Sequence, residues 1–211
     1  MLNNASVSSL GNKCLGVVLA GGLSSRMGYD KAQLIRDKNA TLSMLAFSKQ
    51  LLSDSGLSNI VVSGDKYDVP DLVKKGGPVG GIASILAQFP QAESLLILPV
   101  DLPFMTAKAL TELRLKGELS QKATYFKGHN IPLYLPNNAF LELFLAQAFT
   151  KAPHSKGGSD QLSNKAKKQG PSIKALLSKV PNQAIESNDL NILFNTNTPE
   201  QWQQAKQQFS T

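Results

Sequence analysis

The sequence predicts an α/β fold: a three-layer α/β/α sandwich around a mainly parallel, Rossmann-like sheet. Apolar runs suited to strands buried on both faces alternate along the chain with segments whose apolar residues recur at helical spacing. The run at 15–20 breaks abruptly into glycines, and the run that begins at Leu95 ends in a carboxylate between two prolines. With 211 residues the chain is expected to be a single domain, 1–211.

The stretch that organises the chain is 19–31, Leu-Ala-Gly-Gly-Leu-Ser-Ser-Arg-Met-Gly-Tyr-Asp-Lys. Gly21 and Gly22 permit backbone conformations that a Cβ forbids, and they let consecutive N–H groups approach an anion. Arg26 offers a planar fork for phosphate oxygens and Lys31 a mobile point charge. The stretch therefore predicts a triphosphate-binding loop, and it matches neither a Walker A loop nor a dinucleotide-binding fingerprint.

Asp101 ends the second decisive stretch, where Pro99 and Pro103 restrict the backbone and fix where the carboxylate points. A strand-end carboxylate that faces a phosphate-binding loop predicts a magnesium ligand. Mg²⁺ prefers hard oxygen ligands, takes only one or two carboxylates from the protein and leaves its other positions to phosphate oxygens and water. The alternative is an aspartate that only caps the next turn.

Between these stretches we expect a helix capped by Thr41 and ended by Gly56, and then a short strand at 59–62. That strand delivers Ser63 to the edge where open parallel sheets bind ligands. Glycines at 76–81 predict a second loop, followed by a helix with one apolar side, formed by Ile82, Ile85, Leu86 and Phe89.

The second half of the chain predicts four helices and two strands. Thr106 is the expected cap of the first helix, the apolar face of the second comprises Phe140, Leu143, Phe144 and Ala148, and the third is expected at 172–179. The strands are expected at 123–126 and at 192–194, the latter as the final strand. Thr198, followed by Pro199 and by Gln201 at the third helical position, predicts a capping box.

The composition limits the classes of partner. A net charge of +7 suits either nucleic acid or small polyanions such as nucleoside triphosphates. Basic residues are spread along the chain, with enrichment only between Lys151 and Lys168, and no nucleic-acid-binding motif occurs. Small polyanions are therefore favoured and nucleic acid is not expected. The polar, lysine-rich segment 151–170 predicts a flexible surface loop.

The sequence also indicates in which cellular compartment the protein is expected. No apolar run approaches the length of a membrane span and the first residues are polar, so we expect a cytoplasmic protein without a membrane partner. Cys14 is the only cysteine, which excludes an intramolecular disulfide and a multi-cysteine zinc site. Its place just before an apolar strand predicts a buried thiol.

The pattern Leu-Ala-Gly-Gly-x-Ser-x-Arg-Met-Gly-x-Asp-Lys resembles the signature loop of nucleotidyltransferases with the nucleotide-diphospho-sugar transferase fold. Within them it is most similar to the molybdenum cofactor guanylyltransferases, the MobA family. Pro-x-Asp-x-Pro at 99–103 and Asn-x-Asn-Thr-Pro-Glu at 195–200 resemble further motifs of that family. Gly-Pro-Val-Gly-Gly at 77–81 is similar to its Gly-Pro-Leu-Ala-Gly segment, and 129–133 is loosely similar to its acceptor-binding region.

The resemblance implies transfer of GMP from GTP to the phosphate of molybdenum-bearing molybdopterin, with release of pyrophosphate and with Mg²⁺ as cofactor. It also implies, as further partners, other molybdenum cofactor biosynthesis proteins or recipient molybdoenzymes. Catalytic roles fall on Arg26, Lys31 and Asp101, and Asp101 is the metal ligand. The residues implied in GTP binding are Leu19, Ala20, Gly21, Gly22, Lys31, Ser63, Asp71, Gly80 and Asp101. Those implied in acceptor binding are Arg26, His129, Asn195 and Asn197.

Two alternatives remain open at the level of sequence. The first is a related nucleotidyltransferase that uses CTP or a sugar phosphate acceptor. Signature loops of such enzymes more often contain Leu-Ala-Ala-Gly, so Gly21 argues against it, whereas Ser63 stands where the guanine-using family usually has an asparagine. The second is a nucleotide- or nucleic-acid-binding protein without catalysis, for which the net charge of +7 is the only support.

Overall fold

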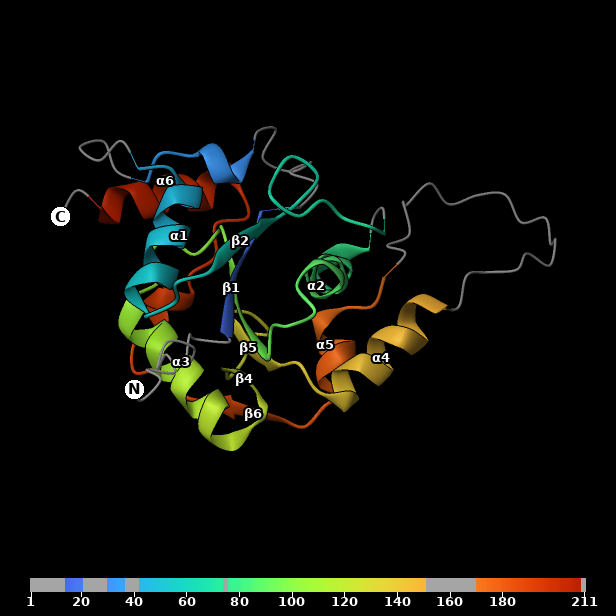
Figure 1. The fold of residues 1–211 in the computed structure, drawn as a ribbon. Helices are drawn as coiled ribbons and strands as arrows, with labels where there is room; N and C mark the ends of the chain where they lie inside the picture. Colours follow the sequence, from blue (N-terminus) through green and yellow to red (C-terminus); the bar gives the residue numbers. More distant parts are fainter. Residues whose placement is uncertain (1–13, 21–29, 37–41, 74–75, 151–169, 210–211) are drawn as a thin grey trace, which may run out of the picture.

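The computed structural model describes residues 14–20, 30–36, 42–73, 76–150 and 170–209 (Figure 1). Three predicted site residues, Gly21, Gly22 and Arg26, lie outside this part of the chain, as does nearly all of the lysine-rich segment. No described helix has the length and apolar character needed to cross a membrane.

In the part of the chain that the structure describes, six strands form one sheet in the order β2-β1-β3-β5-β4-β6. β1 is parallel to both of its neighbours, β2 and β3, and β4 is parallel to β6. β5 is antiparallel to β3 and to β4, so it alone runs against the other five described strands. The predicted mainly parallel sheet is confirmed, with one reversed strand inside it. The bounds are β1 Cys14–Leu19, β2 Ile60–Ser63, β3 Ser94–Pro99, β4 Ala123–Phe126, β5 Leu133–Pro136 and β6 Asn182–Ile185.

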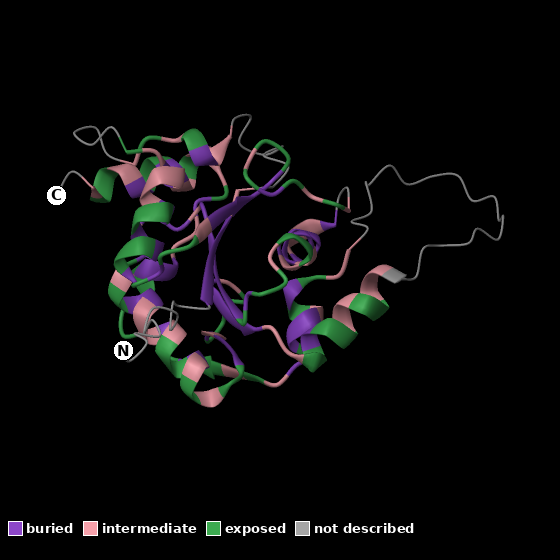
Figure 2. Cartoon of the chain, viewed as in Figure 1, coloured by how far each residue is buried: buried purple, intermediate pink, exposed green. Residues whose placement is uncertain are grey.

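Helices cover both faces of the sheet, which confirms the three layers (Figure 1). One face carries α1 (Met44–Asp54), α3 (Ala107–Ser120) and α6 (Pro199–Gln208), and the other carries α2 (Gly77–Gln88), α4 (Ala139–Thr150) and α5 (Ile173–Leu177). Figure 2 shows the buried centre of the sheet: β3 is buried along its whole length, and β1 is buried everywhere except at Leu19, its last residue.

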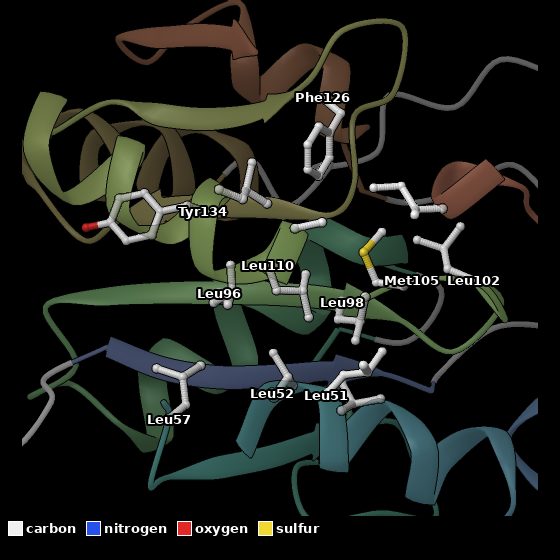
Figure 3. Close-up of a cluster of buried hydrophobic side chains, with 14 of the residues drawn as sticks. Leu51, Leu52, Leu57, Leu96, Leu98, Leu102, Met105, Leu110, Phe126 and Tyr134 are labelled. Carbon is white, nitrogen blue, oxygen red and sulfur yellow. The ribbon is translucent and has the colours of Figure 1, made fainter. Parts of the chain in front are cut away.

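Alternate residues of the strands supply two separate cores, because successive side chains of a strand point to opposite faces. Leu96 and Leu98 of β3 belong to the core against α1 and α3, where they meet Leu52 and Leu110 (Figure 3). Ile97 belongs to the core under α2, α4 and α5. Burial on both faces is the reason why β3 is an unbroken apolar run in the sequence.

Cys14, at the start of β1, is buried as predicted. Burial raises the pKa of its thiol to about 11. The thiol is therefore protonated and shielded at neutral pH, which accords with a structural role in the core.

The structure corrects the predicted start of α1. The cap is Ser43, whose hydroxyl accepts a hydrogen bond from the backbone N–H of Ala46, so the cap predicted at Thr41 is wrong. Both residues are good caps, and the choice depends on where the preceding chain joins the helix. Gly56 follows the helix with φ +89°, which confirms the predicted end.

The second glycine-rich segment is helix rather than loop, because α2 already begins at Gly77. A Cβ at Gly81 would stand 2.7 Å from the hydroxyl oxygen of Ser63, at the end of β2. A Cβ at Gly76 would stand 2.9 Å from the carbonyl oxygen of Val73. Glycine therefore serves close packing here, a use that the sequence pattern does not distinguish from a loop.

The predicted final strand at 192–194 is also wrong. Residues Leu190–Leu193 form a single 3-10 turn, η2, capped by Asp189, and Ile192 and Leu193 are buried in the core. The sixth strand is instead β6 (Asn182–Ile185), which is largely polar. β6 lies at the edge of the sheet, and Ile185 is its only buried residue. It therefore lacks the apolar run that is typical of the central strands.

Helix α4 is confirmed, but its buried face differs from the predicted one. Leu141 is buried, and Phe144 and Leu145 pack against the same core. Phe140 and Leu143 are 55% and 59% exposed, whereas the sequence pattern predicts both on the apolar face. Apolar residues occur around most of this helix, so periodicity alone does not define the side that packs.

Candidate active site

The carboxyl ends of the three parallel strands define the candidate site. Leu19 of β1 is paired in register with Ser63 of β2 and with Pro99 of β3, so the three strands end level with one another. The backbone N–H of Ala20 donates to the carbonyl oxygen of Ser63 at 3.0 Å. Leu19, Ala20 and Ser63, all predicted to bind nucleotide, therefore lie at the edge where parallel sheets bind ligands.

Lys31, Asp101 and Asn197 meet at this edge and are called the lysine cluster below. The ammonium of Lys31 lies 3.2 Å from Asp101 Oδ2 and donates to Asn197 Oδ1 at 2.8 Å. The Lys31 and Asp101 side chains are only 17% and 15% exposed. The structure thus joins three predicted site residues from the beginning, middle and end of the chain.

Hydrogen bonds from Thr196 fix the backbone carbonyl group of Asp101, a member of the lysine cluster. The backbone N–H and the hydroxyl of Thr196 both donate to the carbonyl oxygen of Asp101, at 3.0 and 3.2 Å. Thr196 is almost fully buried, so this double contact ties the segment before α6 to the end of β3. The sequence prediction missed Thr196, although its position between the two asparagines of the 195–200 motif was a usable signal.

The predicted capping box of α6 is confirmed and extends to the cluster. Thr198 accepts from the backbone N–H of Gln201, whose side-chain oxygen accepts from the backbone N–H of Thr198 at 3.0 Å. The same Gln201 oxygen also accepts from the backbone N–H of Asn197 at 2.7 Å. The cap therefore orients the asparagine that contacts Lys31, so the motif has both a structural and a site-forming part.

Two oxygen atoms beside the cluster suit a cation. Asp101 Oδ1 and Asn195 Oδ1 are buried and have no hydrogen-bond partner among the described residues. Buried oxygens without partners are rare in proteins and favour a ligand that satisfies them. Because Asp101 supplies a hard carboxylate oxygen, this donor set fits Mg²⁺, which needs few protein carboxylates when phosphate is bound. Within the described ranges, no three His, Cys, Asp or Glu side chains gather into a larger metal site.

Asp71 lies beyond β2, against the first turns of α2. Its carboxylate stands 3.6 Å from the position that a Gly81 Cβ would occupy, and its backbone N–H donates to Asp65 Oδ1 at 3.3 Å. Burial raises the pKa of Asp71, and the charge of Asp65 raises it further. Gly80 is buried in the same turns of α2. Asp71 and Gly80 are therefore neighbours of the β2 end of the site.

Ser63 and His129 occupy contrasting positions. Ser63 is only 2% exposed, and its hydroxyl is enclosed beneath Gly81. His129 lies in the turn between β4 and β5, with an exposed side chain and with its backbone N–H donating to the carbonyl oxygen of Phe126. Since β4 runs parallel to β1, this turn is at the same edge of the sheet, but β5 separates β4 from β3. His129 is thus placed at the periphery of the site.

Comparisons with known proteins bear on this arrangement. Residues 16–167 match the family model of the MobA-like NTP transferase domain. The chain is 30% identical over 192 residues to the molybdenum cofactor guanylyltransferase of Xanthomonas euvesicatoria pv. vesicatoria (strain 85-10), an alignment that covers 89% of this chain and 91% of that protein. The family resemblance of the signature loop is thereby confirmed.

Solved structures share the fold. Molybdopterin-guanine dinucleotide biosynthesis protein A from Archaeoglobus fulgidus is similar over 93% of this chain and 98% of its own, with a TM-score of 0.64 and 20% identity. Rv0371c from Mycobacterium tuberculosis H37Rv, crystallised in complex with manganese, is similar over 92% and 98%, with a TM-score of 0.58 and 14% identity. Because the family model and the guanylyltransferase of Xanthomonas both cover most of its length, the chain belongs to the MobA-like NTP transferase family.

Proposed function

We propose that the protein transfers GMP from GTP to the phosphate of molybdenum-bearing molybdopterin, forming the molybdopterin guanine dinucleotide cofactor and pyrophosphate. Family membership makes the chain a nucleotidyltransferase, and the relative with 30% identity is named for this guanylyl transfer. The observation that carries the proposal is the lysine cluster, which brings the Lys31 ammonium and the Asp101 carboxylate together at the carboxyl edge of the sheet. One oxygen of that carboxylate, Oδ1, has no hydrogen-bond partner among the described residues.

The proposed reaction is a displacement at phosphorus. An oxygen of the acceptor phosphate attacks the α-phosphorus of GTP, the bond from that phosphorus to the bridging oxygen of the β-phosphate breaks, and pyrophosphate leaves. A phosphate monoester is already ionised near neutral pH, so the acceptor needs no strong general base. Catalysis then consists of positioning and of neutralising negative charge, which a lysine, backbone amides and a divalent cation supply.

Each group of the cluster has a role in this scheme. Lys31 supplies positive charge to the β- and γ-phosphates, together with Arg26 and the amides of Gly21 and Gly22, which lie outside the described residues. Asp101 would hold Mg²⁺ through Oδ1, which has no hydrogen-bond partner among the described residues. The bound ion would neutralise triphosphate charge and orient the phosphates. Arg26, Asn195 and Asn197 would face the acceptor, with His129 at its outer edge.

Asp71 is the residue proposed to recognise the guanine base. A carboxylate can accept two hydrogen bonds side by side, and guanine presents two such donors, N1–H and N2–H₂, on its Watson–Crick edge. Adenine and cytosine lack this pair of donors. Leu19, Ala20 and Gly80 would form the walls around the nucleoside. Ser63 would act by holding α2 close to the sheet, because its hydroxyl is enclosed.

The test is pyrophosphate release with GTP, ATP or CTP, each supplied with Mg²⁺ and molybdenum-bearing molybdopterin. GTP should support turnover and should raise the melting temperature more than the other nucleotides. Turnover with CTP, or with a sugar phosphate in place of molybdopterin, would support the related transferase instead. Nucleotide binding without pyrophosphate release from any pair would support a non-catalytic protein. In the cell, the product would pass in the cytoplasm to recipient molybdoenzymes or to other proteins of cofactor biosynthesis.

A further inference from the structure

The chain after β2 folds into a loop, 64–69, that is hydrogen-bonded to the end of its own strand. The backbone N–H of Val69 donates to the carbonyl oxygen of Val62, and the N–H of Gly64 donates to that of Val69. Asp68 accepts from the N–H of Val62 at 2.9 Å, and the N–H of Tyr67 donates to Gly64 at 2.9 Å. Four hydrogen bonds thus fix the backbone of Tyr67 relative to the sheet.

The Tyr67 hydroxyl reaches from this loop to the turn that carries Lys31. It donates to Asp30 Oδ2 at 2.9 Å, while Asp30 Oδ1 accepts from the backbone N–H of Ala32 at 3.0 Å. Asp30 therefore uses one oxygen to cap the 3-10 turn η1 (Lys31–Gln33) and the other to anchor that turn to Tyr67. Lys31 follows Asp30 directly, and its ammonium contacts Asp101.

We propose that Tyr67 is a positioning residue for phosphoryl transfer. Through Asp30 it fixes the turn that aims Lys31 at the triphosphate, and it couples this turn to the loop that leads to Asp71. The proposal rests on the proposed function, because it assigns Lys31 to the phosphates. Nothing in the local sequence pattern marks Tyr67, since its partner is 37 positions away in the chain.

A phenol suits this role for an electrostatic reason. It satisfies the second oxygen of Asp30 with a neutral donor, so no further positive charge is added to compete with Lys31 for phosphate. Partial burial raises the pKa of Tyr67, and its hydrogen bond to Asp30 raises it further, so the hydroxyl stays protonated at neutral pH.

The experiment is Tyr67→Phe, which removes the hydroxyl and keeps the ring. With Mg²⁺ present, the dissociation constant for GTP should rise about fivefold, in keeping with the net contribution of a typical hydrogen bond. GMP binding should stay close to that of the wild type, because GMP lacks the phosphates that Lys31 contacts. The kcat for pyrophosphate release should fall as well. The matched control is Tyr125→Phe, which removes an exposed phenol–amide contact of 3.2 Å with Asn182 and should change neither measurement.

A double-mutant cycle separates positioning from a general structural role. If Tyr67 acts through Lys31, Tyr67→Phe should not weaken GTP binding further in a Lys31→Ala background. An additive loss in the double variant, or an equal loss for GTP and GMP, would overturn the proposal, as would unchanged GTP binding and kcat in Tyr67→Phe.

The two proposals fail in different ways. If the wild type selects another triphosphate, the guanine assignment of the proposed function is overturned. The double-mutant cycle of Tyr67→Phe and Lys31→Ala, measured with that triphosphate and its monophosphate, still decides the role of Tyr67. If the wild type binds no nucleoside triphosphate, both proposals are overturned. An active wild type with an unaltered Tyr67→Phe variant overturns the positioning role alone.

Discussion

Lys31 and Asp101 form a partly buried ion pair in which only one carboxylate oxygen takes part. The ammonium lies 3.2 Å from Oδ2, and Oδ1 has no hydrogen-bond partner among the described residues. A pair of this kind holds both side chains in place while leaving one oxygen for a ligand. We therefore propose separable functions for the two residues: Lys31 acts on phosphate charge, and Asp101 acts on the cation. Substitutions that remove one charge at a time test this separation.

Asp101→Asn should lower turnover by about a hundredfold, or roughly 3 kcal/mol of transition-state stabilisation, because it removes the negative charge that holds Mg²⁺ against the phosphates. The melting temperature should change little, since the backbone contact with Thr196 remains. The measurement is initial rate as a function of Mg²⁺ concentration.

Glu186→Gln is the control for Asp101→Asn. It removes a carboxylate from an exposed 2.6 Å ion pair with Lys127, next to the outermost strand β6, which β5 and β4 separate from β3, and it should leave the Mg²⁺ titration unchanged. Near wild-type turnover of Asp101→Asn with an unaltered Mg²⁺ titration would show that Asp101 only caps a turn.

Lys31→Ala should weaken GTP binding on the order of tenfold, because a hydrogen bond to a charged group contributes about 1.5–3 kcal/mol. GMP should be affected much less, since it lacks the β- and γ-phosphates. Isothermal titration with both nucleotides checks this, with Lys127→Ala as a control lysine from an exposed ion pair. The same loss for GTP and GMP would assign Lys31 to the nucleoside instead.

Asp71→Asn should abolish the preference for GTP and stabilise the fold near pH 7. Burial, and then the charge of Asp65, raises the pKa of Asp71 in the folded state. A carboxyl group whose folded pKa is raised contributes its full stability below its unfolded pKa and loses it as the pH rises through the folded pKa. At pH 7 the charged carboxylate therefore destabilises the fold, and the neutral amide removes this cost.

The check on Asp71→Asn is thermal unfolding at several pH values without nucleotide. The melting temperature of the variant should exceed that of the wild type near pH 7, and the difference should shrink as the pH falls and Asp71 takes up a proton. A lower melting temperature at pH 7 would show that the charged form is favoured in the fold. Retained selectivity for GTP would remove Asp71 from base recognition.

Gly81→Ala should destabilise the protein by about 1–3 kcal/mol through overpacking. Its Cβ would stand 2.7 Å from the enclosed hydroxyl of Ser63, whereas a Cβ at Gly80 would find its nearest neighbour at 3.7 Å. Gly80→Ala is therefore the matched control and should be tolerated. Adding Ser63→Ala to Gly81→Ala should restore stability in urea unfolding, and the absence of any rescue would place the conflict elsewhere.

The strand-end residue Asp101 and two of the three predicted helix caps, Thr106 and Thr198, could be predicted from the sequence, because their signals are local. Asp101 follows an apolar run between two prolines, and Thr198 stands in a capping box that the structure contains in full. The meeting of Asp101 with Lys31 follows from a general rule, since parallel strands deliver their carboxyl ends to one edge of a sheet.

Features that depend on tertiary contacts could not be predicted. The polar edge strand β6 forms because β4 offers it a partner, and the buried Ile192 and Leu193 serve a 3-10 turn rather than a strand. The glycines of α2 allow the helix to approach Ser63, which a linear pattern does not distinguish from a flexible loop. Tyr67 and Asp30 meet only in the fold.

The contact between Lys31 and Asn197 spans 166 positions of the chain, and Thr196 is also needed to hold the carbonyl of Asp101. A ribosome delivers the amino-terminal strands and the signature loop long before it delivers these residues. A chain whose synthesis stops after β6 contains all of the described strands, but it lacks the asparagine that contacts the lysine. The lysine cluster is therefore complete only after translation has passed residue 197, when nearly the whole chain has been made.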